Sequence, residues 1–246
     1  MQSQLIDVWP LRLDLSAQTL GSLRPLLSED ELGRVARLRS EHVAARFVAA
    51  RGQLRRILGS VLDRDPASLR FAYGEFGKPS LQGGPSVLHD EPSVRFNLSH
   101  SGELGLLAVA EHAELGVDIE SNHARERGEQ IARRWFAALE VEALMALPAR
   151  ERDAGFLRCW TRKEAYVKAL GGGLQTPLDG FAVTLGSDEP ARLRWCNDPG
   201  ELQRWTLVDL SDVHDGATAA ACVEATAARV RVHEPDYVSR DVRHRR

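Results

Sequence analysis

Two carboxylates in the chain are spaced to share one face of a short strand. Residues 116–120 read Gly-Val-Asp-Ile-Glu, and side chains two positions apart in a β-strand lie on the same face. Asp118 and Glu120 therefore project together, while Val117 and Ile119 point into a core. Carboxylate oxygens are the ligands that hard divalent cations prefer, and such a cation offsets the repulsion between the two acids.

A helix later in the chain is expected to bring a third carboxylate and a lysine to the same place. Residues 156–173 have a helical pattern in which Trp160, Glu164 and Lys168 are spaced i, i+4 and i+8 along one face. If this helix crosses the end of the strand, Glu164 joins the two strand carboxylates. The resulting site would hold a metal ion and leave open positions for phosphate oxygens beside a lysine.

Two further groups suit phosphate chemistry. The sequence Gly-Lys-Pro at residues 77–79 combines a glycine, which permits close backbone approach, with Lys78, whose ammonium is a point charge for phosphate. Ser99 and His100 stand in a stretch predicted to be a polar turn, residues 99–102, where a hydroxyl and an imidazole offer directional hydrogen bonds.

Each of these features also has an ordinary explanation. An Asp-x-Glu at a strand end is usually two solvated carboxylates, and Glu164 with Lys168 is usually an exposed helix pair that contributes roughly a few tenths of a kcal/mol. His100 alone is more often a surface residue, and Lys78 alone is an ordinary loop lysine. The functional interpretation depends on their combination and order along the chain.

Composition indicates a soluble globular protein. The 246 residues are 43% apolar, and 32 basic residues nearly balance 35 acidic ones, so no overall field favours nucleic acid. No run approaches the roughly 18 apolar residues of a membrane span, and the N-terminal residues lack the pattern of a signal peptide. The three cysteines are widely spaced, which indicates free thiols in a reducing compartment, and we expect a cytoplasmic location.

The order of predicted elements positions these groups. Ser28 and Glu31 have the spacing of a capping box at the start of a helical pattern that covers residues 29–62 and is interrupted near Ser40. Arginines are dense in this stretch; most are interpreted as a solvated face, and a few are candidates to cradle a polyanion. Other predicted helices cover residues 131–136 and 140–147, and a long one ends at Gly171; predicted strands cover residues 5–9, 69–73, 94–98, 104–110, 115–120, 181–185, 192–195, 205–210 and 217–225, with a loop at 81–92.

These elements indicate an α+β fold built as a pseudo-duplicated, two-half architecture. Each half is predicted to be a small antiparallel sheet packed with a long helix, and the active site is expected at the seam between them, near residue 115. The predicted halves are residues 1–113, which carry Lys78 and Ser99, and residues 114–228, which carry the acids. Residues 229–246 are rich in arginine and are predicted to be a flexible tail.

Four motifs in sequence resemble those of the 4′-phosphopantetheinyl transferases of the large, Sfp type. They are FGKP at 76–79, FNLSHSG at 96–102, GVDIE at 116–120 and WTRKEAYVK at 160–168, the last running into GGGL and then PL. Each motif alone is weak, whereas four in this order and spacing are specific. The resemblance covers residues 28–185, and the Trp and Lys-Glu-Ala residues of the last motif are similar to the subgroup named for that signature.

The resemblance implies an enzyme that uses coenzyme A and Mg²⁺. Such an enzyme moves the phosphopantetheine arm of coenzyme A to a serine of an acyl or peptidyl carrier protein and releases 3′,5′-ADP. The carrier could serve fatty-acid, polyketide or nonribosomal peptide synthesis, and the sequence does not choose among them. Because both halves of the site lie in one chain, a monomer is expected.

The resemblance also implies roles for individual residues. Asp118, Glu120 and Glu164 match metal-binding acids, with Glu120 the least secure of the three, and Glu164 is also the candidate base for the carrier serine. The remaining matches are Lys168 for the pyrophosphate, Ser99 and His100 for phosphates, Lys78 for the adenine and 3′-phosphate, and Arg34, assisted by Arg46 or Arg51, for the 3′-phosphate. Glu31 stands where some members have a lysine, and the capping box explains it better.

Two other functions remain as alternatives. The first is a non-catalytic module that binds coenzyme A or a carrier protein, which would have no need to keep Asp118, Glu164 and Lys168 together. The second is a Mg²⁺-dependent phosphohydrolase, an enzyme type that commonly needs further acids, and the sequence has no second pair of carboxylates in a comparable turn.

Overall fold

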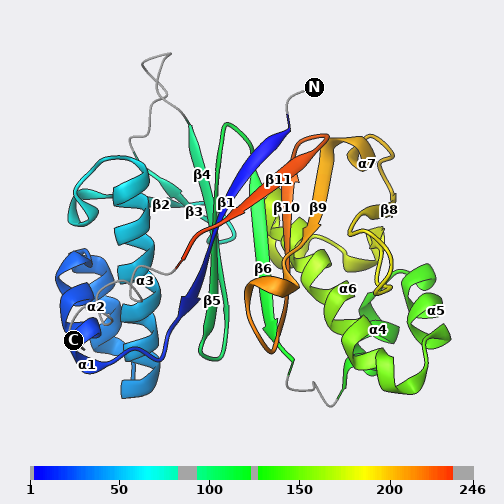
Figure 1. Ribbon diagram of the computed structural model, residues 1–246, viewed down its shortest axis with the longest axis horizontal. Coiled ribbons are helices and arrows are strands. Elements are labelled where there is room, and N and C mark those ends of the chain that lie inside the picture. The colour runs from blue at the N-terminus through cyan, green and yellow to red at the C-terminus, as the bar shows by residue number, and fades with distance from the viewer. Residues whose placement is uncertain (1–2, 83–92, 123–126, 235–246) are drawn as a thin grey trace, which may run out of the picture.

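The chain forms two sheet-and-helix halves, shown in Figure 1. Residues 3–82, 93–122 and 127–234 are described by this computed structural model. The strands are β1 (Gln4–Arg12), β2 (Phe71–Tyr73), β3 (Pro79–Leu81), β4 (Val94–Ser101), β5 (Leu104–Glu111), β6 (Leu115–Ser121), β7 (Phe181–Val183), β8 (Leu193–Cys196), β9 (Trp205–Asp209), β10 (Ala217–Glu224) and β11 (Ala228–Val232). The α-helices are α1 (Ala17–Leu23), α2 (Glu29–Arg37), α3 (Glu41–Val61), α4 (Gly128–Trp135), α5 (Ala138–Ala146), α6 (Ala149–Leu170) and α7 (Glu201–Arg204).

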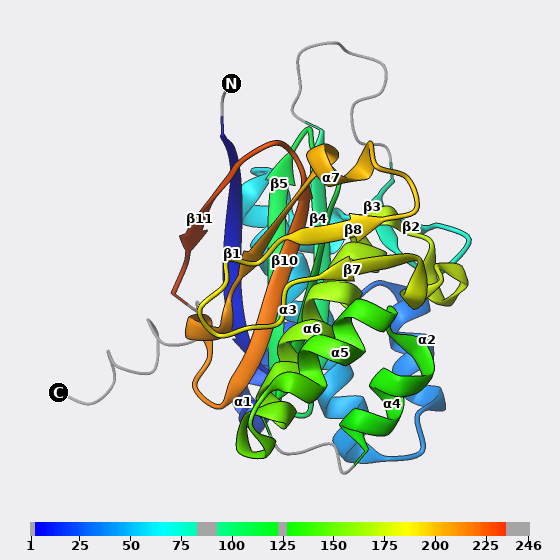
Figure 2. The ribbon, with the colours of Figure 1, turned by 90° about the vertical axis from the view of Figure 1, so that its right-hand side faces the viewer.

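The two main sheets pack face to face between two helical layers (Figures 1 and 2). The first sheet has the strand order β11-β1-β5-β4 and the second β6-β10-β9; β2 pairs with β3 and β7 with β8 in two smaller sheets. Apolar side chains of β1 and β5 meet those of β6 and β10 in a central core. The long helix α3 covers the outer face of the first sheet, and α6 covers the outer face of the second. The predicted α+β class is confirmed.

The strand β11 corrects the expected C-terminal tail. Residues 228–232 pair in parallel with β1, and the ring of His233 stacks on Trp9 with 4.3 Å between centroids. The alternation Ala-Arg-Val-Arg-Val explains this, because Ala228 and Val230 pack against the central core while the arginines between them face away. The predicted tail is therefore wrong for its first residues, and residues 235–246 lie outside the described part of the chain.

Local signals place α2 and α3 as predicted. The backbone N–H of Ser28 donates to Glu31 at 3.0 Å in the capping box that begins α2, and the helical pattern breaks at Ser40, which begins α3. The sequence interpretation missed α1, α7, β3 and β11. The predicted loop at 81–92 begins with the end of β3, and its residues 83–92 are not described.

Gly116 allows α6 to lie directly on β6, the strand that carries Asp118 and Glu120. A Cβ atom at this position would lie 2.2 Å from the carbonyl oxygen of Ala165 and 2.4 Å from the backbone nitrogen of Ala169, both in α6. Only a residue without a side chain permits this approach. The contact brings the next same-face residue of β6, Asp118, beside the last turns of α6.

We expect Gly116→Ala to destabilise the protein by about 3 kcal/mol, at the upper end of the usual cost of overpacking, because the atoms that the new Cβ would meet are backbone atoms that cannot rotate away. Urea unfolding gives the measurement. Gly33→Ala is the matched control, since no atom lies within 4 Å of a Cβ at that helical position, and it should leave stability unchanged or slightly raise it. Equal effects of the two changes would contradict the close packing of β6 on α6.

The inner face of α6 carries a buried ion pair. Lys163 and Glu140 have fully buried side chains, and the Lys163 ammonium donates to both carboxylate oxygens, at 2.9 and 2.7 Å, and to the carbonyl of Phe181 at 2.8 Å. Glu140 also accepts hydrogen bonds from the backbone nitrogens of Ala137 and Val183. The pair therefore ties α5 and β7 to α6.

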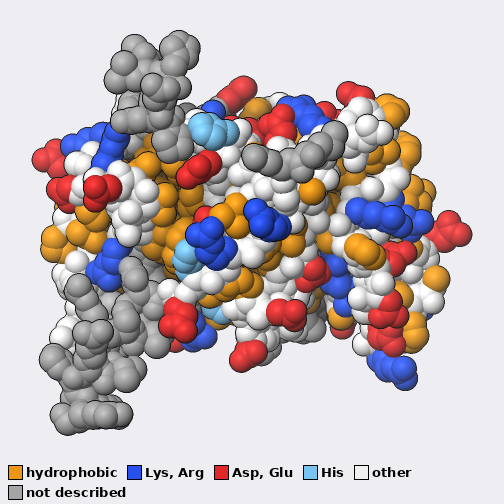
Figure 3. Space-filling model, turned by 45° about the horizontal axis from the view of Figure 1, so that its top comes forward, with side chains coloured by type: hydrophobic (Ala, Val, Ile, Leu, Met, Phe, Trp, Pro, Cys, Tyr) orange, Lys and Arg blue, Asp and Glu red, His pale blue; other side chains and the backbone are white. Residues whose placement is uncertain are grey.

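The surface is mixed in charge. Acidic, basic and apolar side chains are interspersed on the face drawn in Figure 3, in keeping with the balanced composition. Among the described helices, none has the length and apolar character that crossing a bilayer requires.

Candidate active site at the seam between the two sheets

Side chains of β4 bridge the seam to β6. These edge strands of the two sheets lie beside each other, and alternate residues of β4 face β6, as the period of a strand requires. Hydrogen bonds cross between the two strands: the backbone N–H of Val117 donates to Asn97 Oδ1 at 2.9 Å, Ser99 Oγ donates to Asp118 Oδ1 at 2.9 Å, and Ser101 Oγ donates to Glu120 Oε2 at 2.8 Å.

The predicted polar turn at residues 99–102 is therefore wrong in its extent. Strand β4 continues to Ser101, and the turn begins at Gly102, whose φ is +60°. The polar residues continue the strand because their hydroxyls find carboxylate partners on β6 rather than water. Ser99 is buried as a result, and its bond to Asp118 joins the two halves of the molecule.

Lys168 meets Ser99 and Asp118 at this seam. Its ammonium donates to Asp118 Oδ1 at 2.5 Å and to Ser99 Oγ at 2.9 Å. Burial raises the pKa of Asp118, and the charge and hydrogen bond of Lys168 oppose this without cancelling it. The structure thus brings together, from β4, β6 and α6, three of the residues that the sequence marked for phosphate or metal chemistry.

Asp118 is the acid whose surroundings best suit a cation. Its Oδ2 atom is buried and has no hydrogen-bond partner in the part of the chain that the structure describes, and a buried carboxylate oxygen without a partner is costly. Glu120 is bound to Ser101, and Glu164 lies on α6 facing a cavity. Within the described residues, no three His, Cys, Asp or Glu side chains gather closely enough to form a metal site. One oxygen of Asp118 therefore fits a divalent cation, and a three-carboxylate set is not gathered in this arrangement.

A cavity of about 790 Å³ opens beside these residues. One wall is the turn between β2 and β3, residues 76–79, and a second is the face of α6 that carries Trp160, Glu164 and Lys168. A third wall comes from α4, whose Trp135 is 52% exposed. The volume of the cavity lies within the usual range of small-molecule sites, and its mostly apolar lining with a few charged groups is typical of such sites.

Lys78 links this cavity to the end of α6. Its ammonium donates to Glu114 Oε2 at 2.9 Å and to the carbonyl oxygen of Ala169 at 3.1 Å. The second bond satisfies one of the carbonyls left open in the last turn of α6, which ends at Gly171 as predicted. Lys78 is therefore both a lining residue and a tie between the two halves.

Comparisons with known proteins identify the family. The model of the 4′-phosphopantetheinyl transferase superfamily matches residues 114–222. The transferase HetI from Nostoc sp. is 36% identical over 221 residues, which are 90% of this chain and 88% of that protein. The chain belongs to this transferase family. The transferase psf-1 of Bacillus pumilus is 31% identical over 77% of each chain, and Sfp of Bacillus subtilis is 34% identical over 58% of this chain and 63% of Sfp.

Among solved structures, the Thermotoga maritima holo-[acyl-carrier-protein] synthase aligns with a TM-score of 0.36 and 23% identity, covering 47% of this chain and 64% of that one. The segment that the family model matches contains Asp118, Glu164 and Lys168.

Of the residues predicted to contact phosphates, Lys78 lines the seam cavity, whereas Arg34, Arg46 and His100 do not. Alternation places His100 on the face of β4 opposite Ser99, toward α3. His100 is exposed overall, but its ring is partly buried. This burial lowers the pKa of His100, and the positive charges of Lys168 and Arg46 lower it further. Arg46 Nη2 pairs with Glu103 at 3.4 Å, and its buried Nε has no hydrogen-bond partner among the described residues. Arg34 is exposed, with its guanidinium 4.9 Å from the centre of the Phe47 ring. Neither arginine lines the cavity.

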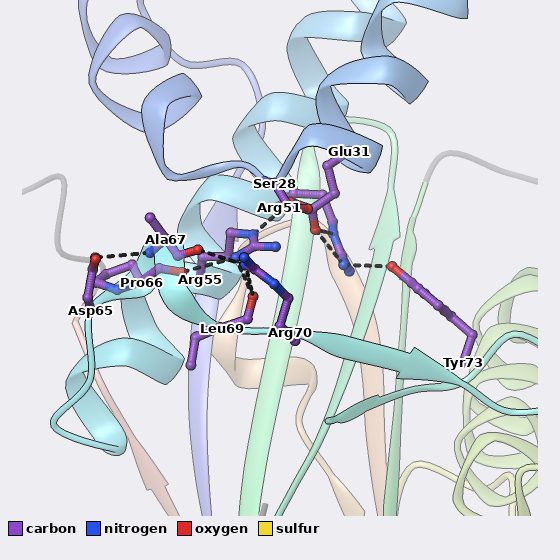
Figure 4. A network of polar contacts seen from close by, with 10 residues as sticks. All are labelled: Ser28, Glu31, Arg51, Arg55, Asp65, Pro66, Ala67, Leu69, Arg70 and Tyr73. Atoms are coloured by element: carbon purple, nitrogen blue, oxygen red, sulfur yellow. Dashed lines mark hydrogen bonds and ion pairs between the residues drawn. The ribbon is translucent and has the colours of Figure 1, made fainter. Parts of the chain in front are cut away.

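Arg51 and Arg55 belong to a buried network of hydrogen bonds and ion pairs, drawn in Figure 4. Arg51 Nε donates to Glu31 Oε1 at 2.8 Å, and Arg55 Nε donates to Glu31 Oε2 at 2.6 Å. Sequence reasoning assigned Glu31 to the capping box alone and treated these arginines as surface or phosphate ligands. The spacing of the two arginines, four apart on one helix face, is the signal that could have indicated a shared buried acid.

The free energy of unfolding at acid pH should depend on this network. Burial alone would raise the pKa of Glu31, but the hydrogen bond from Arg55 and the charge of Arg51 outweigh it and hold the pKa below its ordinary value of 4.5. Because the folded state favours the ionised form, Glu31 stabilises the transferase above pH 4.5, and this contribution is lost as pH falls below that value.

The difference in unfolding free energy between wild type and Glu31→Gln should therefore be largest near pH 7 and shrink as pH falls below about 4.5. Urea unfolding at several pH values measures it. Glu29→Gln makes the same charge change in the exposed first turn of the same helix, and should have little effect at any pH. A pH-independent effect of Glu31→Gln would show that the ion pairs do not carry the contribution.

Proposed function

We propose that this protein transfers the 4′-phosphopantetheine arm of coenzyme A to a serine of an acyl or peptidyl carrier protein, releasing 3′,5′-ADP and converting the apo carrier to its holo form. The observation that carries the proposal is the convergence of Lys168, Asp118 and Ser99 beside a cavity of about 790 Å³. Membership of the transferase family supports it.

In this proposal the chain's own residues position the reactants and stabilise charge. Mg²⁺ would be held at the Oδ2 atom of Asp118, with Glu120 and Glu164 as proposed further ligands that would have to move toward it, and it would supply positive charge next to the pyrophosphate. Glu164 takes the proton of the carrier serine, whose oxygen attacks the β-phosphorus while the bond to the bridging oxygen breaks and 3′,5′-ADP leaves. Lys168 offsets the negative charge that grows on the phosphate oxygens, and Ser99 holds the aspartate and lysine in register.

The nucleotide end of coenzyme A is assigned to both sides of β4. Lys78 is proposed to contact the adenine and 3′-phosphate from the cavity wall. Arg46, His100 and Arg34 are proposed for the 3′-phosphate; Arg46 pairs with Glu103 through Nη2 at 3.4 Å, and its buried Nε, which has no partner among the described residues, is left to bind an anion.

Arg46→Gln should raise the KM for coenzyme A about tenfold or more, with a smaller change in kcat, because a charge-assisted hydrogen bond contributes on the order of 1.5–3 kcal/mol. Dephospho-coenzyme A lacks the 3′-phosphate, so wild type and variant should differ less with it. Arg34→Ala and His100→Ala are tested in the same way. If the ratio of the KM values of variant and wild type is the same with coenzyme A and with dephospho-coenzyme A, the residue concerned does not contact the 3′-phosphate.

We also propose that the transferase acts as a cytoplasmic monomer, since β4, β6 and α6 of one chain supply the seam residues. Light scattering at assay concentration measures the oligomeric state. A dimer that persists on dilution would contradict this part of the proposal.

The transfer itself is tested by incubating the protein with coenzyme A, Mg²⁺ and an apo carrier protein and measuring the carrier mass. We expect a gain of one phosphopantetheine, dependent on both Mg²⁺ and the carrier serine. Binding of coenzyme A without a mass gain would favour a non-catalytic module. Cleavage of coenzyme A without a carrier would favour a phosphohydrolase, and either result would overturn the proposal.

A further inference from the structure

The hairpin of β2 and β3 forms a wall of the cavity but belongs to neither main sheet. It is a separate two-stranded sheet in which Phe71 pairs with Leu81 and Tyr73 with Pro79. Its turn, residues 76–79, lines the cavity. A hairpin of this size is marginally stable alone, so the position of this wall depends on what anchors it.

One end of the hairpin is anchored to the second half. Lys78 binds Glu114, next to the start of β6, and the carbonyl of Ala169 in α6. Phe76 packs against the loop after α6, where a Cβ on Gly173 would lie 2.7 Å from the Cβ of Phe76. These contacts hold the tip of the turn.

The hairpin is anchored to the first half by Phe71 and Leu81, which pack against the core beneath α3, and, beside the turn, by the phenol of Tyr73. Arg51 Nη2 donates to the hydroxyl of Tyr73 at 2.8 Å, as Figure 4 shows. Tyr73 is 51% exposed, so its ring buries little apolar surface and the hydroxyl is its principal link to the fold.

Arg51 is itself fixed in position by its other contacts. Its Nε and Nη2 atoms lie 2.8 and 2.7 Å from Glu31 Oε1, and its guanidinium lies 4.8 Å from the centre of the Phe71 ring. Arg55 holds the second oxygen of the same carboxylate. The donor that meets Tyr73 is therefore rigid, and a rigid donor can fix the strand it holds.

We propose that Arg51 and Tyr73 are a positioning pair for coenzyme A binding. They hold the β2–β3 hairpin so that the wall carrying Phe76 and Lys78 is formed before the ligand arrives, and they do so without touching coenzyme A. A wall ordered in advance lowers the cost of binding. The inference rests on the proposed function, and it gives Arg51 a different role from the direct phosphate contact expected from sequence.

The test is Tyr73→Phe, which removes one oxygen and keeps the ring. The KM for coenzyme A should rise about three- to tenfold, the effect of one net hydrogen bond, while kcat stays within about twofold because no transition-state contact is lost. Dephospho-coenzyme A should show the same fold increase. In the ligand-free protein, amide hydrogen exchange should quicken at Gly74 and Gly77, whose N–H groups donate to carbonyls within the turn.

Tyr166→Phe is the matched control. It removes a phenol hydroxyl that binds Glu201 at 3.1 Å in the second half, and it should leave both the KM for coenzyme A and exchange in the hairpin unchanged. An unchanged KM and unchanged exchange for Tyr73→Phe would overturn the inference. So would an increase that disappears with dephospho-coenzyme A, because that would place the pair directly on the 3′-phosphate.

These outcomes are separate from the fate of the proposed function. If wild type transfers phosphopantetheine and Tyr73→Phe behaves identically, the positioning role fails and the function stands. If wild type transfers nothing, the proposed function fails first, and only the exchange measurement still reports on how the hairpin is anchored.

Discussion

Lys168→Met is expected to lower kcat by about 100-fold or more, while the KM for coenzyme A changes less. The Lys168 ammonium lies 2.5 Å from Asp118 and 2.9 Å from Ser99, where it is proposed to meet the pyrophosphate. Charge on the phosphate oxygens grows as the bridging bond breaks, so the lysine acts mainly on the transition state, and removing one preorganised donor commonly costs about 10²–10³ in kcat. Steady-state kinetics at saturating Mg²⁺ provide both constants.

Two further variants separate this role from a structural one. Lys168→Arg keeps the charge and should recover part of the lost turnover. Asp118→Asn removes the carboxylate proposed to bind the metal ion, so it should abolish transfer. Because burial raises the pKa of Asp118, its ionised form does not favour the folded state, and the unfolding free energy should not fall. If Lys168→Met kept near-normal turnover and only lowered stability, Lys168 would be a structural partner of Asp118.

Glu140→Ala is expected to lower the unfolding free energy by about 3–5 kcal/mol, the usual cost of removing one partner of a buried ion pair. The change would leave the ammonium of Lys163 in the core, where its side chain is fully buried. It would also remove the acceptor of two backbone N–H groups, those of Ala137 and Val183. Urea unfolding followed by circular dichroism provides the measurement.

The control for Glu140 is an ion pair at the surface. Arg150, 85% exposed, pairs with Glu151 at 3.5 Å, and Arg150→Ala should change stability by less than about 0.5 kcal/mol. Combining Glu140→Leu with Lys163→Met should be less damaging than Glu140→Ala, because no uncompensated charge remains. A double variant as unstable as the sum of its single changes would show that the two residues act independently.

Local periodicity was sufficient to predict which residues of β6 face the core and which face carries Asp118. The two-residue period of β6 placed Val117 and Ile119 in the core and Asp118 on the opposite face, as the structure confirms. Capping at Ser28 and the break at Ser40 were also predicted, since caps act within a few residues. These features depend on neighbours in the sequence.

Contacts between distant segments were not predictable in the same way. Ser99 and Ser101 appeared to belong to a turn because their carboxylate partners lie about twenty residues along the chain. Arg51 appeared to be a phosphate ligand because its partner Glu31 is on another helix. Strand β11 was not predicted because its sequence is rich in arginine, and the arginines are directed outward only once the strand pairs with β1. The metal ligands and the phosphate contacts remain predictions.

A crystal structure of the protein with coenzyme A and Mg²⁺ tests the central claim most directly. We predict the pyrophosphate in the seam cavity, in contact with Lys168, with the metal ion bound to Asp118 and the β2–β3 turn against the nucleotide. Coenzyme A bound elsewhere on the surface, with Lys168 still paired to Asp118 and no metal at that carboxylate, would contradict the assignment of the active site.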